Sequence, residues 1–235
     1  VKLTPKVREI ANDEAIPAIP AGAIAAYLKE GLVVSREEIA EAPYIVGGRD
    51  RRVIFGEGDT VYARDVKDEW ADLQRGYGFY RVGEQYVDPD TNEVLGYEAR
   101  QIGLGRVADH DEDMLTLRVT RSSEDLRIDD RLFSTEDRRV RSVLYPSAPD
   151  TKIEGKVIRF FDRISSVARN DVVVVNKGLR DGLKEGNVLD VFGQGEAVRD
   201  RQRGDMVRLP RERIGSMVIF RVFDKVSYGL IMESS

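Results

Sequence analysis

Three glycines at intervals of four residues, Gly178, Gly182 and Gly186, follow a run of four valines in NDVVVVNKGLRDGLKEGNVLDVF at residues 170–192. A phosphate-binding loop needs a strand, a glycine turn and then a helix whose amide groups face the anion. The segment after Gly186 is β-branched and alternating, which favours a strand, and it contains no Gly-Lys-Ser/Thr. We therefore interpret the glycines as structural turn residues. Gly178 and Gly182 are expected to supply positive φ, and Gly186 to start the next strand.

The acidic clusters match no catalytic or metal-binding pattern. The single histidine, His110, lies among Asp109, Asp111 and Asp113, but this stretch lacks the glycine and the final glutamate of a calcium loop, so a solvated turn is favoured over a cation site. DPDTN at 88–92 is typical of a turn before a strand. The sequence has no cysteine, which excludes disulfides and thiolate metal sites. We predict no catalytic residues, no metal and no cofactor, and expect that the protein is not an enzyme.

Two stretches offer side chains to a partner. VRDRQRGDMVRLPRER at 198–213 has six arginines against three acids and is expected to lie outside the sheets; it is either a loop that binds carboxylates or phosphates, or a solvated loop. Adjacent residues of a strand point to opposite faces, so one phenylalanine of IRFFDR can face outward. The candidate partner-binding residues are Arg199, Arg201, Arg203, Arg208, Phe160, Phe161 and Arg163.

The aromatic segment GYGFYRVGEQY, at 76–86, could present rings to a sugar or a protein, but core packing of a β-unit is favoured. A glycosidase would need two paired carboxylates and aromatic platforms. The chain has abundant acids but a single tryptophan, Trp70, in a charged run. The sequence alone does not indicate which two acids could form such a catalytic pair.

The charge is unevenly distributed. Residues 151–235 carry 16 Lys and Arg against 12 Asp and Glu, a net charge of +4, which leaves −9 for the other residues because the whole chain carries −5. This pattern indicates either two units that face different neighbours or ordinary surface scatter. The low pI, about 5.2, argues against nucleic-acid binding, and no stretch has the ~20 apolar residues of a membrane span.

Alternation and turn residues predict a mainly β chain of two small barrel-like or sandwich-like units, built from recurring meanders. Ser35 and Glu38 predict a capping box and a short helix that ends before Pro43, residues 76–107 predict a series of short hairpins, and the valine run predicts a strand buried on both faces. We expect a lead-in with short helices over 1–50, a first β-unit over 51–146 and a second over 151–235. The second unit is expected to continue by one strand beyond the chain.

Four long segments of the sequence are similar to those of a known protein family: VVVVNKGLRDGLKEGNVLDVF, RLPRERIGSMVIFRVFDKVSYGLIM, YPSAPDTKIEGKVI and YRVGEQYVDPDTNEVLGYEA. They resemble the C-terminal region of the LysM-containing type IV pilus secretin-associated proteins of Gram-negative bacteria. The resemblance covers nearly the whole chain. The C-terminal part is also similar to a flagellar basal-body ring protein domain.

The resemblance implies a periplasmic, outer-membrane-associated scaffold whose partner is the outer-membrane secretin ring, with several copies possible around that ring. In the family a LysM module binds peptidoglycan, but this sequence contains no such module, so peptidoglycan binding is not assigned to its residues. The family has no catalytic motif to carry over. Two alternatives stay open: a cell-wall glycan-binding protein or hydrolase, and a flagellar basal-body ring component.

Overall fold

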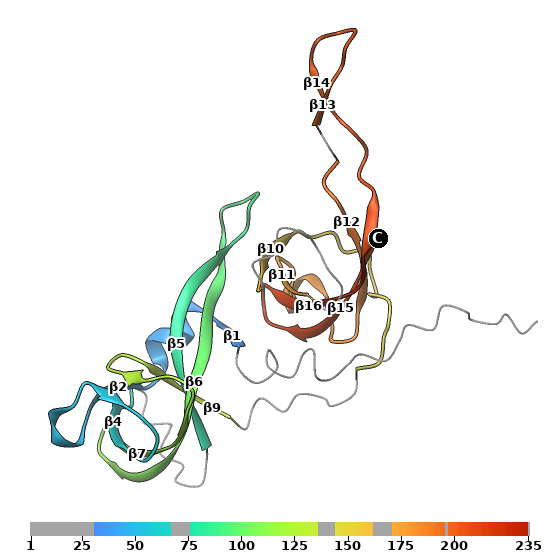
Figure 1. Cartoon of the computed structure of the whole chain (residues 1–235). Helices are drawn as coiled ribbons and strands as arrows, with labels where there is room; N and C mark the ends of the chain where they lie inside the picture. The colour runs from blue at the N-terminus through green and yellow to red at the C-terminus, as the bar shows by residue number, and fades with distance from the viewer. Residues whose placement is uncertain (1–30, 67–75, 136–143, 162–170, 196, 235) are drawn as a thin grey trace, which may run out of the picture.

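The computed structural model describes residues 31–66, 76–135, 144–161, 171–195 and 197–234. Within these residues the chain is mainly β, which confirms the predicted fold class, and it has one α-helix. Figure 1 shows two β-units, a long hairpin that reaches from the first unit to the second, and a thin arm that projects from the second unit.

The first unit is a sheet that closes on itself. The strand order is β1-β6-β5-β9-β2-β4-β7, and an additional pairing between β6 and β7 completes the closure. Its elements are β1 (Gly31–Val34), α2 (Arg36–Glu41), β2 (Tyr44–Gly48), a 3-10 turn (Arg49–Arg51), β3 (Ile54–Phe55), β4 (Thr60–Arg64), β5 (Gly76–Val87), β6 (Val94–Asp111), β7 (Met114–Ser122), β8 (Leu126–Arg127) and β9 (Arg131–Ser134).

Helix α2 begins where the sequence predicts. The Ser35 hydroxyl accepts a 3.1 Å hydrogen bond from the Glu38 N–H, and the Glu38 carboxylate accepts one of 2.6 Å from the Ser35 N–H. The predicted capping box is confirmed. However, the expected lead-in contributes to the first unit itself, because β1 pairs with β6 and β2 pairs with both β4 and β9.

The expected series of short hairpins over 76–107 is wrong. The segment forms the long strand β5 and most of β6, joined at the predicted DPDTN turn. The glycines that suggest breaks make room for rings instead: a Cβ on Gly105 would lie 2.6 Å from the Phe79 ring, and one on Gly78 would lie 2.4 Å from the Tyr80 ring. Tyr77, Phe79 and Tyr80 are each at most 1% exposed, so the aromatic segment is core in the first unit.

The second unit is a five-stranded sheet in the order β10-β11-β16-β15-β12. Its valine strand is buried on both faces, as predicted: Val172 and Val174 pack in one apolar cluster, and Val173 and Val175 in another. Its elements are β10 (Val157–Phe160), β11 (Val172–Val175), a 3-10 turn (Leu179–Asp181), β12 (Val188–Phe192), β15 (Arg213–Val222) and β16 (Ser227–Ser234).

The three spaced glycines are required for two different reasons. Gly182 has φ +90° and Gly186 has φ +93°, so both occupy the left-handed region. Gly178 has φ −141°, which corrects the expectation of positive φ there. Gly178 is needed because a Cβ would lie 2.4 Å from the carbonyl oxygens of Phe223 and Asp224.

Candidate interaction surface

The arginine-rich stretch lies outside both main sheets, as predicted, and forms a projecting arm, residues 193–212. β12 and β15 are paired up to Phe192 and Arg213, and the chain leaves the sheet between them. In the arm β13 (Ala197–Arg199) pairs with β14 (Met206–Arg208) in a two-stranded sheet of its own. Figure 1 shows this arm extending away from both units.

Local hydrogen bonds close the tip of the arm. The Asp200 carboxylate accepts hydrogen bonds from the N–H groups of Gln202, at 2.7 Å, and Arg203, at 3.2 Å. Gly204 has φ +80°, and its N–H donates to the Asp200 carbonyl at 2.8 Å. The tip is therefore a turn specified by Asp200 and Gly204, with a Gly where the backbone requires positive φ.

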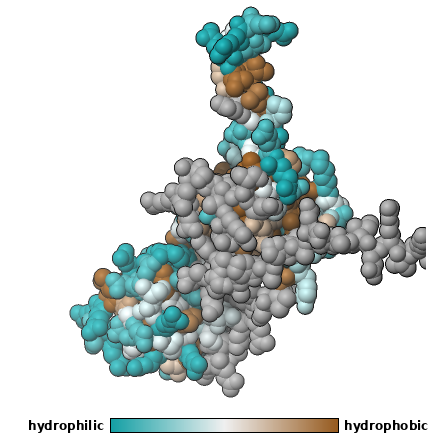
Figure 2. Space-filling model, turned by 45° about the vertical axis from the view of Figure 1, so that its right-hand side comes forward, coloured by the Kyte–Doolittle hydropathy of each residue, from teal (hydrophilic) through white to brown (hydrophobic). Residues whose placement is uncertain are grey.

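The middle of the arm exposes apolar side chains. Met206 is 65% exposed, and Val207 and Leu209 are each 45% exposed. Figure 2 shows a hydrophobic band on the projecting arm below a hydrophilic tip. The arm therefore carries exposed apolar area below a charged tip, a combination typical of interaction sites.

Arginines surround this apolar band. Arg199 donates to the Gly204 carbonyl, whereas Arg201, Arg203 and Arg208 form no ion pair among the described residues. Methionine and arginine are enriched at protein interfaces. The arm thus combines free guanidinium groups with exposed apolar area on a narrow projection.

The other predicted contact segment is only partly available. Phe160 is 40% exposed, so it can contact a partner. Phe161 is partly buried and packs edge-to-face on Tyr228, with ring centroids 5.2 Å apart, against the buried cluster of the second unit, so it is less available than Phe160. Arg163 lies outside the described residues.

A junction between the two units was not predicted. The Asp88 carboxylate, at the turn of the β5–β6 hairpin, accepts a 2.8 Å hydrogen bond from the Asn176 side-chain amide. The Asn176 oxygen accepts one of 2.6 Å from the Lys156 N–H. Asp88 also accepts hydrogen bonds from the N–H groups of Asp90 and Thr91, and these backbone bonds lower its pKa.

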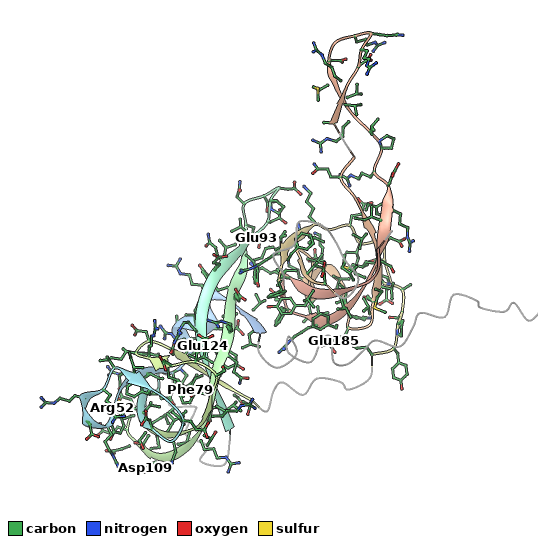
Figure 3. All side chains as sticks on the ribbon, in the orientation of Figure 1. Arg52, Phe79, Glu93, Asp109, Glu124 and Glu185 are labelled. Carbon is green, nitrogen blue, oxygen red and sulfur yellow. The ribbon has the colours of Figure 1, made fainter. Side chains whose placement is uncertain are left out.

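Glu93, at the other side of the same turn, is paired with two cations of the second unit. Arg180 donates two hydrogen bonds to its carboxylate, at 2.7 and 2.9 Å, and Lys225 donates one at 2.8 Å. Arg180 first and Lys225 second lower the pKa of Glu93 to about 2. In Figure 3 Glu93 lies at the end of the hairpin next to the second unit.

Apolar contacts complete the junction. Tyr86 and Leu95, from the two strands of the hairpin, belong to the same buried cluster as Phe220 and Tyr228 of the second unit. The buried Tyr86 and Tyr228 hydroxyls lie next to each other and have no other hydrogen-bond partner among the described residues. Burial, reinforced by Glu98, raises the pKa of Tyr86 to about 12. The hairpin therefore supplies part of the hydrophobic core of the second unit.

The remaining polar features support no chemistry that we can name. Among the described residues no group of His, Cys, Asp and Glu could hold a metal ion. His110 lies at the end of β6, beside the turn into β7, close to where the sequence places it. A shallow pocket of about 170 Å³ on the first unit carries both signs of charge, with Arg52 and Asp59 paired at 3.5 Å. No helix in the described ranges is long and apolar enough to cross a membrane.

No protein-family model matches the chain, and no curated protein matches it significantly.

Proposed function

We propose that this chain is a non-catalytic periplasmic scaffold that associates with the outer-membrane secretin of a type IV pilus. The single observation that carries a binding role is the arm, which exposes Met206, Val207 and Leu209 among unpaired arginines. Exposed apolar area that is rimmed by charge is typical of protein interaction sites. The identity of the partner rests on the resemblance of the sequence.

The junction supports a scaffold role because it fastens the hairpin of the first unit to the second with polar and apolar contacts. Asp88–Asn176 and the Glu93 pairs lie at the same turn, and Tyr86 is buried beside them. Because the two units are joined in this way, the base of the arm has a fixed position relative to the first unit. In the family that the sequence resembles, a LysM module provides the peptidoglycan anchor, so the proposal assigns no peptidoglycan contact to the described residues.

Weak contacts suffice if several copies surround one secretin ring. Linked binding events raise the overall affinity well above that of a single contact. The proposal therefore requires the arm for association but does not require tight binding by one chain.

A pull-down of this chain with the secretin tests the proposal. The wild-type chain is expected to retain the secretin, and Arg199→Ala/Arg201→Ala/Arg203→Ala to retain much less at an unchanged melting temperature. Arg36→Ala/Arg49→Ala/Arg118→Ala removes three arginines from the first unit and is the matched control. No retention of secretin by the wild-type chain would overturn the proposal. Binding or cleavage of soluble muropeptides would point to the glycan alternative.

A further inference from the structure

The arm and the most acidic turn of the first unit lie at opposite ends of the molecule. The end of β6, with Asp109 and Asp111, and the turn into β7, with Glu112 and Asp113, together form this acidic turn. In Figure 3 the labelled Asp109 lies at the far end of the first unit, while the arm projects beyond the second unit. The arm of one molecule therefore does not reach its own acidic turn.

The charges of the two ends are complementary. Asp111 and Glu112 are exposed and form no ion pair within the described residues, whereas Asp113 is paired with Arg64 at 2.7 Å. At the other end, Arg201 and Arg203 are the unpaired cations of the arm tip. The described residues of the first unit, 31–66 and 76–135, carry 12 Arg and Lys against 20 Asp and Glu, a net charge of −8, so the field around the turn is negative.

The acidic turn also has an apolar neighbour. The Asp65 N–H donates a 2.7 Å hydrogen bond to the Asp113 carbonyl, which places Val66 beside the turn. Val66 is 50% exposed. The turn thus offers free carboxylates next to an exposed aliphatic side chain, matching the free guanidinium groups of the arm next to Met206.

We infer that the arm of one copy docks on the acidic turn of the next copy, so that this chain associates head to tail. Such a contact joins two different surfaces, and repetition of it builds rings or open filaments. The arm then supports secretin binding indirectly, by assembling copies whose weak contacts add up. This inference does not depend on the identity of the proposed partner, because it concerns the chain alone.

Sedimentation velocity of the isolated chain tests the contact. At low ionic strength the wild-type chain is expected to form oligomers, and at about 0.5 M salt to dissociate, because exposed charges are then screened over a few ångströms. Arg201→Glu/Arg203→Glu and Asp111→Lys/Glu112→Lys should each weaken association at least about ten-fold. Glu37→Lys/Glu57→Lys makes the same charge change elsewhere on the first unit and should associate like the wild type.

Mixing the two reversal variants provides the decisive measurement. In the mixture, the acidic arm of Arg201→Glu/Arg203→Glu can dock on the basic turn of Asp111→Lys/Glu112→Lys. The basic arm of the latter can dock on the unchanged acidic turn of the former. The mixture should therefore regain oligomers. Circular dichroism verifies that each variant is folded. A wild-type chain that is monomeric at low salt, or a mixture that stays monomeric, overturns the inference. If the chain is monomeric and the arm is still needed to retain the secretin, the arm contacts the secretin directly and the proposed function survives.

Discussion

The side-chain amide of Asn176 donates a 2.8 Å hydrogen bond to the carboxylate of Asp88, which lies 88 residues earlier in the chain. Both residues are almost fully buried, and each has a second structural task. Asp88 shapes the hairpin turn by accepting from Asp90 and Thr91, and Asn176 accepts from Lys156. One hydrogen bond therefore couples the geometry of a turn in the first unit to the strand connections of the second.

Asn176→Ala is expected to destabilise the folded chain by about 1–3 kcal/mol, because it removes the acceptor of the Lys156 N–H and the amide that donates to the buried Asp88 carboxylate. Chemical denaturation monitored by circular dichroism measures this. Gln85→Ala, at an exposed position of the same hairpin, is the control and should stay within about 0.5 kcal/mol of the wild type. Equal stability of the two variants would mean that Asn176 does not hold the junction.

Glu93 predicts a stability change in acid. Its folded pKa is lowered to about 2 from an ordinary value of 4.5, so the unfolded chain takes up a proton first as the pH falls. The stabilisation from Glu93 is full above pH 4.5 and is lost between pH 4.5 and 2. Melting temperatures over this window should fall less steeply for Glu93→Gln than for the wild type, with Glu57→Gln, an exposed acid, as the control.

Tyr86 predicts a change in alkali with the opposite sign. Its folded pKa is raised to about 12, so between pH 10 and 12 the unfolded chain loses the phenolic proton before the folded chain does, and stability falls as the pH rises. Tyr86→Phe should reduce this fall. At pH 7 it should change stability by less than about 1 kcal/mol, because among the described residues the hydroxyl has no hydrogen-bond partner other than the neighbouring Tyr228 hydroxyl. A large loss at pH 7 would show that the hydroxyl is engaged.

Local patterns predicted the local features. Ser35–Glu38, the DPDTN turn and the valine strand all depend on residues within a few positions of each other, and each is confirmed. The junction was not predicted, because its partners are far apart in the sequence: Asp88 pairs with Asn176, and Glu93 with Lys225. Nothing in either segment of the sequence indicates which residue is its partner. The only available signal was the DPDTN turn, whose acids suggest solvent exposure.

Glycine was the residue type most often misinterpreted. Inside β5 and β6 it suggested turns, although its actual role there is to leave space for Tyr80 and Phe79. A missing side chain has the same appearance in a sequence whether the backbone turns or a ring from another strand fills the gap. For the arm, composition indicated an exposed connection, but it did not reveal that Met206 and Leu209 are exposed beside the arginines.

The two glycine roles predict different costs. Gly178→Ala places a Cβ 2.4 Å from two carbonyl oxygens and should cost about 1–3 kcal/mol or more, because backbone atoms cannot move aside easily. At Gly182 the space is open and only the positive φ is unfavourable, so Gly182→Ala should cost about 1 kcal/mol. Thermal denaturation of both variants measures the difference. The reverse order would contradict the geometry of the Gly178 site.

Removal of the arm tests whether the second unit is equally stable without it. Phe192 pairs with Arg213, and the Gly193 N–H donates to the Glu212 carbonyl, so an Asn-Gly turn that replaces residues 194–211 can close the hairpin with its register kept. The described residues of the arm, 193–195 and 197–212, belong to none of the buried clusters. The shortened chain should therefore keep its melting temperature. It should also lose trypsin cleavage at the exposed Arg201 and Arg203, and it should neither self-associate nor retain the secretin. A large fall in melting temperature would instead mean that the arm stabilises the second unit, and exposure alone would no longer argue for a partner.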